Sequence, residues 1–194
     1  NEPLRTGKGW LYEGGTRVPL IVHWPGVTKP GSETERAMTG TDFFPTFLEM
    51  AGLPLRPKDH LDGESFVSAL KGDETPRKKP IFWYFDDARV ATGNPSMAAM
   101  LDGDMKLIHL LYENKYELYN IHDDIGEQHD LAASNPGKVE AMKNALHDWE
   151  KTIGVDSLKK KTKDAVEALW GELKGVEPEK RKKGKKDGDE EESD

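Results

Sequence analysis

The chain has 194 residues, a formal net charge of −8 and an apolar fraction of 35%. This length suits one domain, or one domain with an appendage. The acidic balance argues against nucleic acid as a partner, because a protein needs a basic face to bind phosphates. Cysteine is absent, which excludes disulfides, thiolate zinc sites and cysteine nucleophiles. No apolar run reaches the roughly 18 residues that a membrane helix needs, and no signal peptide is visible.

The first elements of the chain surround a glycine-rich stretch, GKGWLYEGG, at residues 7–15. Glycines that close together indicate a place where the backbone approaches another group closely. A β-branched run over residues 18–23 follows and predicts a short buried strand, which Pro25-Gly26 ends.

Two helices are predicted next. Asp42 offers an N-cap for a helix that runs to residue 51, and Gly52 stops it. We expect Asp42 to serve as this cap rather than in catalysis. Apolar residues cover most sides of the helix, so it should be well buried. A shorter helix is expected around residues 65–71.

Between residues 80 and 120 the pattern changes to that of a small antiparallel meander. Short apolar and aromatic runs alternate with turn signals such as Asp102-Gly103-Asp104. The predicted strands cover residues 81–85, 97–101, 105–111 and 116–119.

Asn135-Pro136 begins another predicted helix. Its apolar residues are spaced by three and four, which places them on one stripe. The stripe consists of Val139, Met142, Leu146, Trp149 and Ile153. We expect this stripe to pack on one face of the meander and to complete a small α+β unit.

Residues 158–173 have an amphipathic pattern that predicts a further helix. The tail after Pro178 consists of a basic block and then an acidic block, and it contains no large apolar residue. It cannot bury enough surface to offset chain entropy, so we expect it to be disordered.

Lys8 is the strongest candidate for a chemical role. Gly7 and Gly9 let the main chain approach a ligand, and the lysine supplies a compact charge with three donors. Such a group can hold a sulfate or phosphate oxygen and stabilise charge on a leaving oxygen. An ordinary surface lysine in a glycine-rich loop is the alternative interpretation.

The stretch GKGWLYEGGTRVPLIVHWPG, residues 7–26, resembles the sulfatase family within the alkaline-phosphatase-like superfamily. Members carry G-K-G-x-x-(Y/W)-E-G-G-x-R-V-P, followed by an apolar strand and W-P-G. Four later segments also resemble family patterns, and the resemblance extends to about Ile153. These segments are TDFFPTFLEMAGLP, LDGESFVSALKG, LDGDMKLIHL and YELYNIHDDIGEQHDLA.

The resemblance implies that Lys8 contacts the sulfate group, as both a catalytic and a substrate-binding residue. Six further residues would give structural support to this site: Gly7, Gly9, Glu13, Gly14, Gly15 and Arg17. The residue types themselves favour a structural ion pair or a backbone clamp for Glu13 and Arg17.

The implied fold is α/β, alkaline-phosphatase-like, and this chain would be a fragment of it. Residues 1–79 would form the C-terminal end of the catalytic domain with its large sheet. Residues 80–155 would form a small antiparallel-sheet subdomain with a packed helix, residues 156–177 an extra amphipathic helix, and residues 178–194 the charged tail. Without the other strands of the large sheet, apolar residues around Val18 to Val22 should be exposed.

The implied reaction is hydrolysis of an aryl or carbohydrate sulfate to the alcohol and inorganic sulfate, in an exported enzyme. Sulfatases use a formylglycine made within C/S-x-P-x-R and a calcium ion held by Asp and Asn ligands. This chain has no cysteine and no S-x-P-x-R. We therefore expect the formylglycine and the calcium ligands upstream of Asn1, no metal bound by this chain, and no activity of the chain alone.

Two other functions stay open. One is a phosphoesterase or phosphonate hydrolase of the same superfamily, and the other is a non-catalytic binding module. The sequence upstream of Asn1 would separate the three, because each requires a different nucleophile and metal set. No residue pattern indicates the oligomeric state.

The remaining polar residues suggest less. Lys106 is expected to point to solvent or to the rim of a cleft. Residues 122–130 are rich in His, Asp and Glu, but their spacing matches no standard metal loop and the resemblance places them in a connecting loop. The sequence departs from the family at His23 and Met100, where arginine is frequent, and at Ile125, where proline is usual. These departures leave the substrate-facing side of the small subdomain open.

Overall fold

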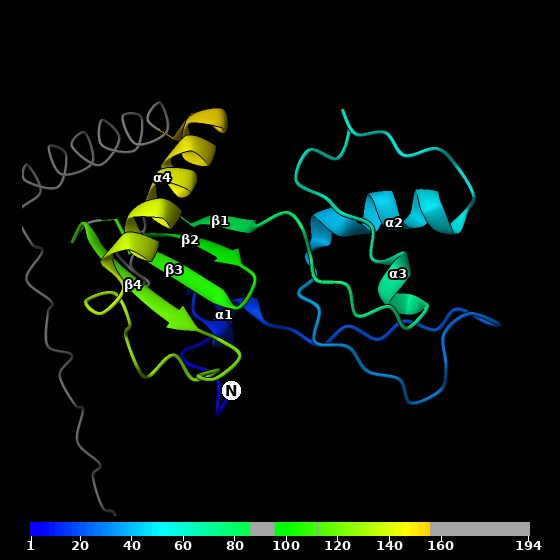
Figure 1. Cartoon of the computed structure of the whole chain (residues 1–194), viewed down its shortest axis with the longest axis horizontal. Coiled ribbons are helices and arrows are strands. Elements are labelled where there is room, and N and C mark those ends of the chain that lie inside the picture. The colour runs from blue at the N-terminus through cyan, green and yellow to red at the C-terminus, as the bar shows by residue number, and fades with distance from the viewer. Residues whose placement is uncertain (86–95, 112, 156–194) are drawn as a thin grey trace, which may run out of the picture. The chain divides into compact units, whose positions relative to one another are not determined.

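A four-stranded antiparallel sheet with the strand order β1-β2-β3-β4 is the central element of the structure, a computed structural model (Figure 1). The strands are β1 (Ile81–Phe85), β2 (Met97–Asp102), β3 (Met105–Leu110) and β4 (Lys115–Asn120). Each strand pairs with the next along the chain, so the predicted meander is confirmed.

The structure describes residues 1–85, 96–111 and 113–155. These residues belong to one unit, residues 1–155. The helix predicted over residues 158–173 and the charged tail lie outside the described residues. Within the described part of the chain, no helix is both long enough and apolar enough to cross a membrane.

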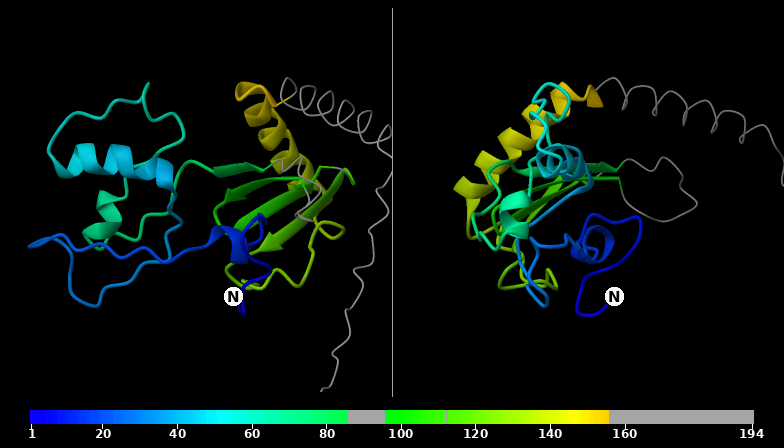
Figure 2. Two further views of the ribbon diagram at one scale, coloured as in Figure 1. Left: turned by 180° about the vertical axis from the view of Figure 1, so that it is seen from behind. Right: turned by 90° about the vertical axis from the view of Figure 1, so that its right-hand side faces the viewer.

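The two faces of the sheet are covered by different parts of the chain, because side chains alternate along each strand. One face carries Met97, Ala99 and Ile108, which pack with Leu11 and Tyr12 of the N-terminal segment. The other face carries Ala98, Met100, Leu107 and Leu118, which pack with Met142 and Leu146 of helix α4. Figure 2 shows the sheet between these two layers. The N-terminal segment is therefore built into this core.

Helix α4 spans Pro136–Thr152 and begins at the predicted Asn135 cap with proline in its first turn. Met142 and Leu146 are buried, and Val139 and Trp149 pack at the edge of the same cluster. The Trp149 ring stacks on Phe82 of β1 with centroids 5.0 Å apart. The prediction was wrong for Ile153, which follows the helix and is 42% exposed.

The helical segment before the sheet contains a 3-10 turn η1 (Gly40–Asp42), α2 (Phe43–Met50) and α3 (Val67–Leu70). Both predicted helices are present, and α3 is shorter than expected. The expectation that the longer helix is well buried was wrong. Phe44 and Phe47 of α2 are 42% and 59% exposed, because nothing in the described residues covers that side.

Residues 18–23 form no strand in the described structure, which corrects that prediction. A strand needs a neighbour for its backbone hydrogen bonds, and the four described strands pair with one another. The apolar side chains are consequently exposed, as expected for this region: Val18 is 77% and Ile21 is 93% accessible.

We predict that Leu146→Ala destabilises the chain by about 2–5 kcal/mol, because the fully buried leucine would leave a cavity between α4 and the sheet. Urea unfolding followed by circular dichroism measures the loss. The control Ile153→Ala removes an exposed apolar side chain and should change stability by less than about 0.5 kcal/mol. Equal losses in the two variants would contradict this account of the α4 face.

Candidate functional site

Lys8 lies at the tip of a tight turn. The Trp10 amide donates to the Gly7 carbonyl oxygen over 3.2 Å, and Gly9 has φ of 90°. A positive φ at the third position of a turn favours glycine. The Lys8 side chain is exposed, and within the described residues its ammonium group has no hydrogen-bond or ion-pair partner. The turn therefore presents a free positive charge.

The short helix α1 (Glu13–Thr16) lies directly against the backbone on either side of Lys8. A Cβ added to Gly14 would lie 2.4 Å from the Arg5 carbonyl oxygen. One added to Gly15 would lie 2.1 Å from the carbonyl oxygen of Trp10 and 2.6 Å from that of Gly7. Only glycine permits these approaches, so the Gly-Gly pair fixes how the Lys8 turn sits on α1.

A buried cluster of charged side chains joins α1 to the sheet. Lys106 Nζ lies 2.8 Å from Glu13 Oε1 and 3.1 Å from Glu127 Oε1. Arg17 Nε donates to Glu13 Oε2 over 2.7 Å, which completes the ion pair that the sequence indicates for these two residues. Glu127 Oε2 accepts the backbone amide of Glu13 over 2.7 Å. Each buried charge therefore has an opposite partner, as burial requires.

The expectation that Lys106 points to solvent or to a cleft rim was wrong, because its side chain is fully buried. The reason is its position in β3. Lys106 and Ile108 are two residues apart and so share the face that the N-terminal segment covers. This parity was visible in the sequence, but the covering segment lies about a hundred positions earlier and carries no local signal for the pairing.

The pKa values of the two glutamates in this cluster are shifted in opposite directions. Burial alone would raise the pKa of Glu13, but the charges of Lys106 and Arg17 hold it below its usual value. Burial raises the pKa of Glu127, and the attraction of Lys106 does not reverse that shift. Arg17 also pairs with Glu13 and lowers its pKa, whereas the negative charge of Glu13 adds to the raised pKa of Glu127.

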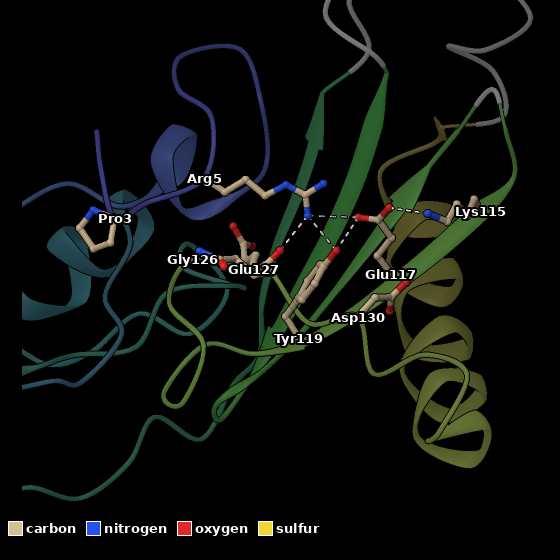
Figure 3. A pocket seen from close by; sticks show the side chains of 9 residues that line it. Pro3, Arg5, Lys115, Glu117, Tyr119, Gly126, Glu127 and Asp130 are labelled. Carbon is tan, nitrogen blue, oxygen red and sulfur yellow. Dashed lines mark hydrogen bonds and ion pairs between the residues drawn. The ribbon is translucent and has the colours of Figure 1, made fainter.

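A second network holds the same N-terminal segment to β4 (Figure 3). Arg5 NH1 donates to the Tyr119 hydroxyl over 2.8 Å, and its guanidinium lies 3.9 Å from the centre of the Tyr12 ring. Glu117 Oε2 accepts the hydroxyls of Tyr12 and Tyr119 over 2.7 and 2.9 Å. Burial and the Glu117 carboxylate raise the pKa of both tyrosines. Both tyrosines therefore stay neutral and act as hydrogen-bond donors.

An open cavity of about 570 Å³ lies beside this network (Figure 3). Its charged side chains bond to one another or to the backbone: Arg5 and Lys115 pair with Glu117, and Asp130 accepts the Leu118 amide. Lys8 is not part of its lining. The lining residues are Pro3, Arg5, Lys115, Glu117, Tyr119, Gly126, Glu127, Gln128 and Asp130.

The acidic and histidine-rich segment after β4 has a structural explanation. Asp124 accepts the amides of Gln128 and His129, and Asp130 accepts those of Leu118 and Ala132. Among the residues that the structure describes, no three His, Asp or Glu side chains are placed to hold a metal ion. The sequence also contains no C/S-x-P-x-R stretch.

Asp42 occupies the predicted N-cap position of α2, but its buried side chain makes no capping hydrogen bond to α2 and belongs to the capping box of η1. Its carboxylate instead accepts the backbone amides of Thr39 and Glu64, each over 2.8 Å, and pairs with Arg77. Asp42 thus ties three segments together, a role that cap statistics cannot show.

Comparison with known proteins places these features in one family. The family described as N-sulphoglucosamine sulphohydrolase, C-terminal, matches residues 6–152. The chain belongs to the C-terminal region of the sulfatase family. The match includes the Lys8 turn, the helical segment, the sheet and all of α4.

Individual relatives agree with this assignment. A protein named sulfatase from Formosa agariphila is 37% identical over 163 residues, which cover 77% of this chain and 30% of that protein. Human arylsulfatase A is 41% identical over 81 residues, covering 42% of this chain and 16% of that enzyme. The crystal structure of Ps i-CgsB in complex with k-i-k-neocarrahexaose is similar with a TM-score of 0.67 and 31% identity, and the match covers 77% of this chain and 32% of that one. This sulfatase segment therefore spans about a third or less of these relatives.

We predict that Glu117 stabilises the chain most above pH 4.5, its ordinary pKa. Burial alone would raise the pKa of Glu117, but Lys115 and the two tyrosine hydroxyls lower it. A lowered folded-state pKa stabilises the fold above the unfolded value, and that contribution is lost as the pH falls through the folded value. Glu117→Gln should therefore lower stability clearly at about pH 7 and less at about pH 3.

Urea unfolding at both pH values measures the difference in the free energy of unfolding between the parent and the variant. Glu140→Gln changes an exposed glutamate on α4 that pairs with Lys143 at the surface, and it serves as the control, with a change in stability of less than about 0.5 kcal/mol expected. If Glu117→Gln lowers the free energy of unfolding by the same amount at both pH values, the charge of Glu117 does not contribute to stability.

Proposed function

We propose that this chain is the C-terminal part of a sulfatase that hydrolyses sulfate esters to alcohol and inorganic sulfate, and that Lys8 binds the sulfate group. The observation that carries this proposal is the Lys8 turn. Its ammonium is exposed and unpaired within the described residues, while the backbone around it is fixed by α1 and the buried charge cluster. A free charge on a rigid support suits anion binding.

The chemistry of lysine fits this role. An ammonium group offers three donors and a compact charge, and it can contact more than one oxygen of a tetrahedral anion. As the ester bond breaks, negative charge builds on the departing oxygen, and a positioned cation stabilises that charge. A phosphate ester would meet the same group, and membership of the sulfatase family favours sulfate. The residues of this chain would contribute the Lys8 contact to the sulfate. The groups that would hold calcium and formylglycine are expected elsewhere in the complete enzyme.

We infer that the substrate is a sulfated carbohydrate or an aryl sulfate. Two relatives support these classes: Ps i-CgsB was solved with k-i-k-neocarrahexaose, and a human relative is an arylsulfatase. The cations that line the open cavity, Arg5 and Lys115, are paired with Glu117, whereas the Lys8 ammonium is unpaired within the described residues.

The finer architecture belongs to the same proposal. Residues 1–79 would complete an α/β catalytic domain in which residues 18–22 form a strand of the large sheet, and residues 80–155 would be the small subdomain. The high exposure of Val18 and Ile21 supports this, because a β-branched apolar run gains stability when a neighbouring strand covers it. The exposed side of α2, with Phe44 and Phe47, would be covered in the same way.

We predict that Lys8→Ala, made in a complete sulfatase that contains this chain, lowers kcat/KM by about 10²–10³-fold, the usual effect of removing one donor to a developing oxyanion. Steady-state kinetics with an aryl sulfate measures it. Lys8→Arg keeps the charge and should retain part of the activity. Lys29→Ala, at another exposed lysine, is the control and should leave the rate unchanged. Full turnover by Lys8→Ala would refute the role of Lys8.

We also predict that the purified 194-residue chain does not hydrolyse an aryl sulfate, because it supplies one sulfate contact without a nucleophile. Release of the phenol, followed by absorbance against a buffer blank, is the measurement. Turnover above the blank that disappears in Lys8→Ala would show that the chain contains a complete active site.

A further inference from the structure

Glu127 binds the N-terminal segment on both sides of Lys8. Its Oε2 atom accepts the Glu13 amide over 2.7 Å, and its backbone carbonyl oxygen accepts Arg5 NH1 over 2.9 Å. Glu127 lies in the loop after β4, more than a hundred positions from both partners. A single residue of the small subdomain therefore holds both ends of the segment that presents Lys8.

The segment between these two anchors has little freedom to move independently of them. The Gly14 amide donates to the Arg5 carbonyl oxygen over 2.9 Å, and the Trp10 amide closes the Lys8 turn on Gly7. Gly15 touches the backbone at both ends of that turn. A shift of Glu13 or Arg5 would consequently move Lys8 with it.

Glu127 is itself held in one place. Its side chain is fully buried, Lys106 Nζ lies 3.1 Å from Oε1, and its amide donates to the Asp124 carbonyl oxygen over 3.0 Å. Its φ is 50°, a left-handed conformation that is uncommon for residues other than glycine. A glycine would suit that backbone better, so the glutamate side chain is explained by what it binds and not by the turn.

We propose that Glu127, supported by Lys106, is a positioning residue for Lys8 and acts through the segment from Arg5 to Glu13. This inference rests on the proposed role of Lys8 in binding sulfate. The Glu127 side chain is buried against α1, so it acts on the substrate only through Lys8. Its removal should displace the ammonium of Lys8, and a displacement of about 1 Å can lower the rate about 10²-fold.

A double-mutant cycle in the complete sulfatase tests this coupling. The variants are Lys8→Ala, Glu127→Ala and the double variant, with kcat and KM measured for an aryl sulfate. Because Glu127 acts through Lys8, Glu127→Ala should lower kcat/KM by about 10–100-fold in the parent and by less than about 2-fold in the Lys8→Ala background. Glu127→Gln keeps an oxygen acceptor for the Glu13 amide and should therefore retain most of the parent kcat/KM.

The possible results separate the two proposals. An unchanged rate in Lys8→Ala overturns the role of Lys8 and the positioning inference with it. A large loss in Lys8→Ala, with the same fold-loss from Glu127→Ala in both backgrounds, overturns the positioning inference alone. If Glu127→Ala does not fold, Glu127→Asp takes its place in the cycle, because its shorter side chain withdraws the acceptor from the Glu13 amide while keeping the charge near Lys106. The same loss only in the parent is expected, and an unchanged rate in the parent or an equal loss in both backgrounds overturns the inference.

Hydrogen exchange of the 194-residue chain tests the clamp without any activity measurement. Glu127→Ala should speed exchange of the amides of Glu13 and Gly14 by about tenfold or more, since it frees the segment, while the amides of α4 stay protected. Glu140→Gln, on the opposite side of the sheet, is the matched control and should change neither. Unchanged protection of Glu13 and Gly14 in Glu127→Ala would overturn the clamp.

Discussion

The buried ammonium of Lys106 is the constraint on which the arrangement of the N-terminal segment depends. Moving a charge out of water costs several kcal/mol even after relaxation, and only close, well-oriented partners offset it. Those partners are Glu13 from one end of the described chain and Glu127 from the loop after β4. If the N-terminal segment left the sheet, Lys106 would keep only one carboxylate and would have to be rehydrated. The docked position of α1 is therefore energetically enforced.

The two faces of the sheet have different structural roles. The face under α4 is dominated by apolar contacts, and burial there is non-directional and sets how stable the unit is. The opposite face combines an apolar cluster with Lys106, Glu117 and the two tyrosine hydroxyls. Hydrogen bonds have preferred distances and angles, so this face also fixes where the segment around Lys8 lies.

The sequence predicted the elements whose signals are local. The meander and the α4 stripe follow from periods of about 2 and 3.6 residues, and Lys8 stands out because of its flanking glycines. The burial of Lys106 depends on a partner segment 93 positions away, which no local pattern encodes. The predictions of a strand at residues 18–23 and of a buried α2 were wrong for a related reason. A strand needs a paired neighbour and an apolar helix face needs a covering segment, and neither partner can be identified from the local sequence. Asp42 kept its predicted backbone position, whereas its side-chain partners come from the loop around Glu64 and Arg77.

The buried cluster of Lys106, Glu13 and Glu127 fixes the position of the Lys8 segment more precisely than an apolar contact of equal area would. Apolar surfaces can slide past one another at little cost, whereas the Glu13 amide points along one direction toward Glu127 Oε2. The proposed role of Lys8 needs that precision, because the ammonium must lie within about 0.5 Å of the position from which it contacts the departing oxygen. The cluster is also neutral when Glu13, Glu127, Arg17 and Lys106 are all charged, so its own field largely cancels. The turn, in contrast, presents the positive charge of Lys8, which has no ion-pair partner within the described residues.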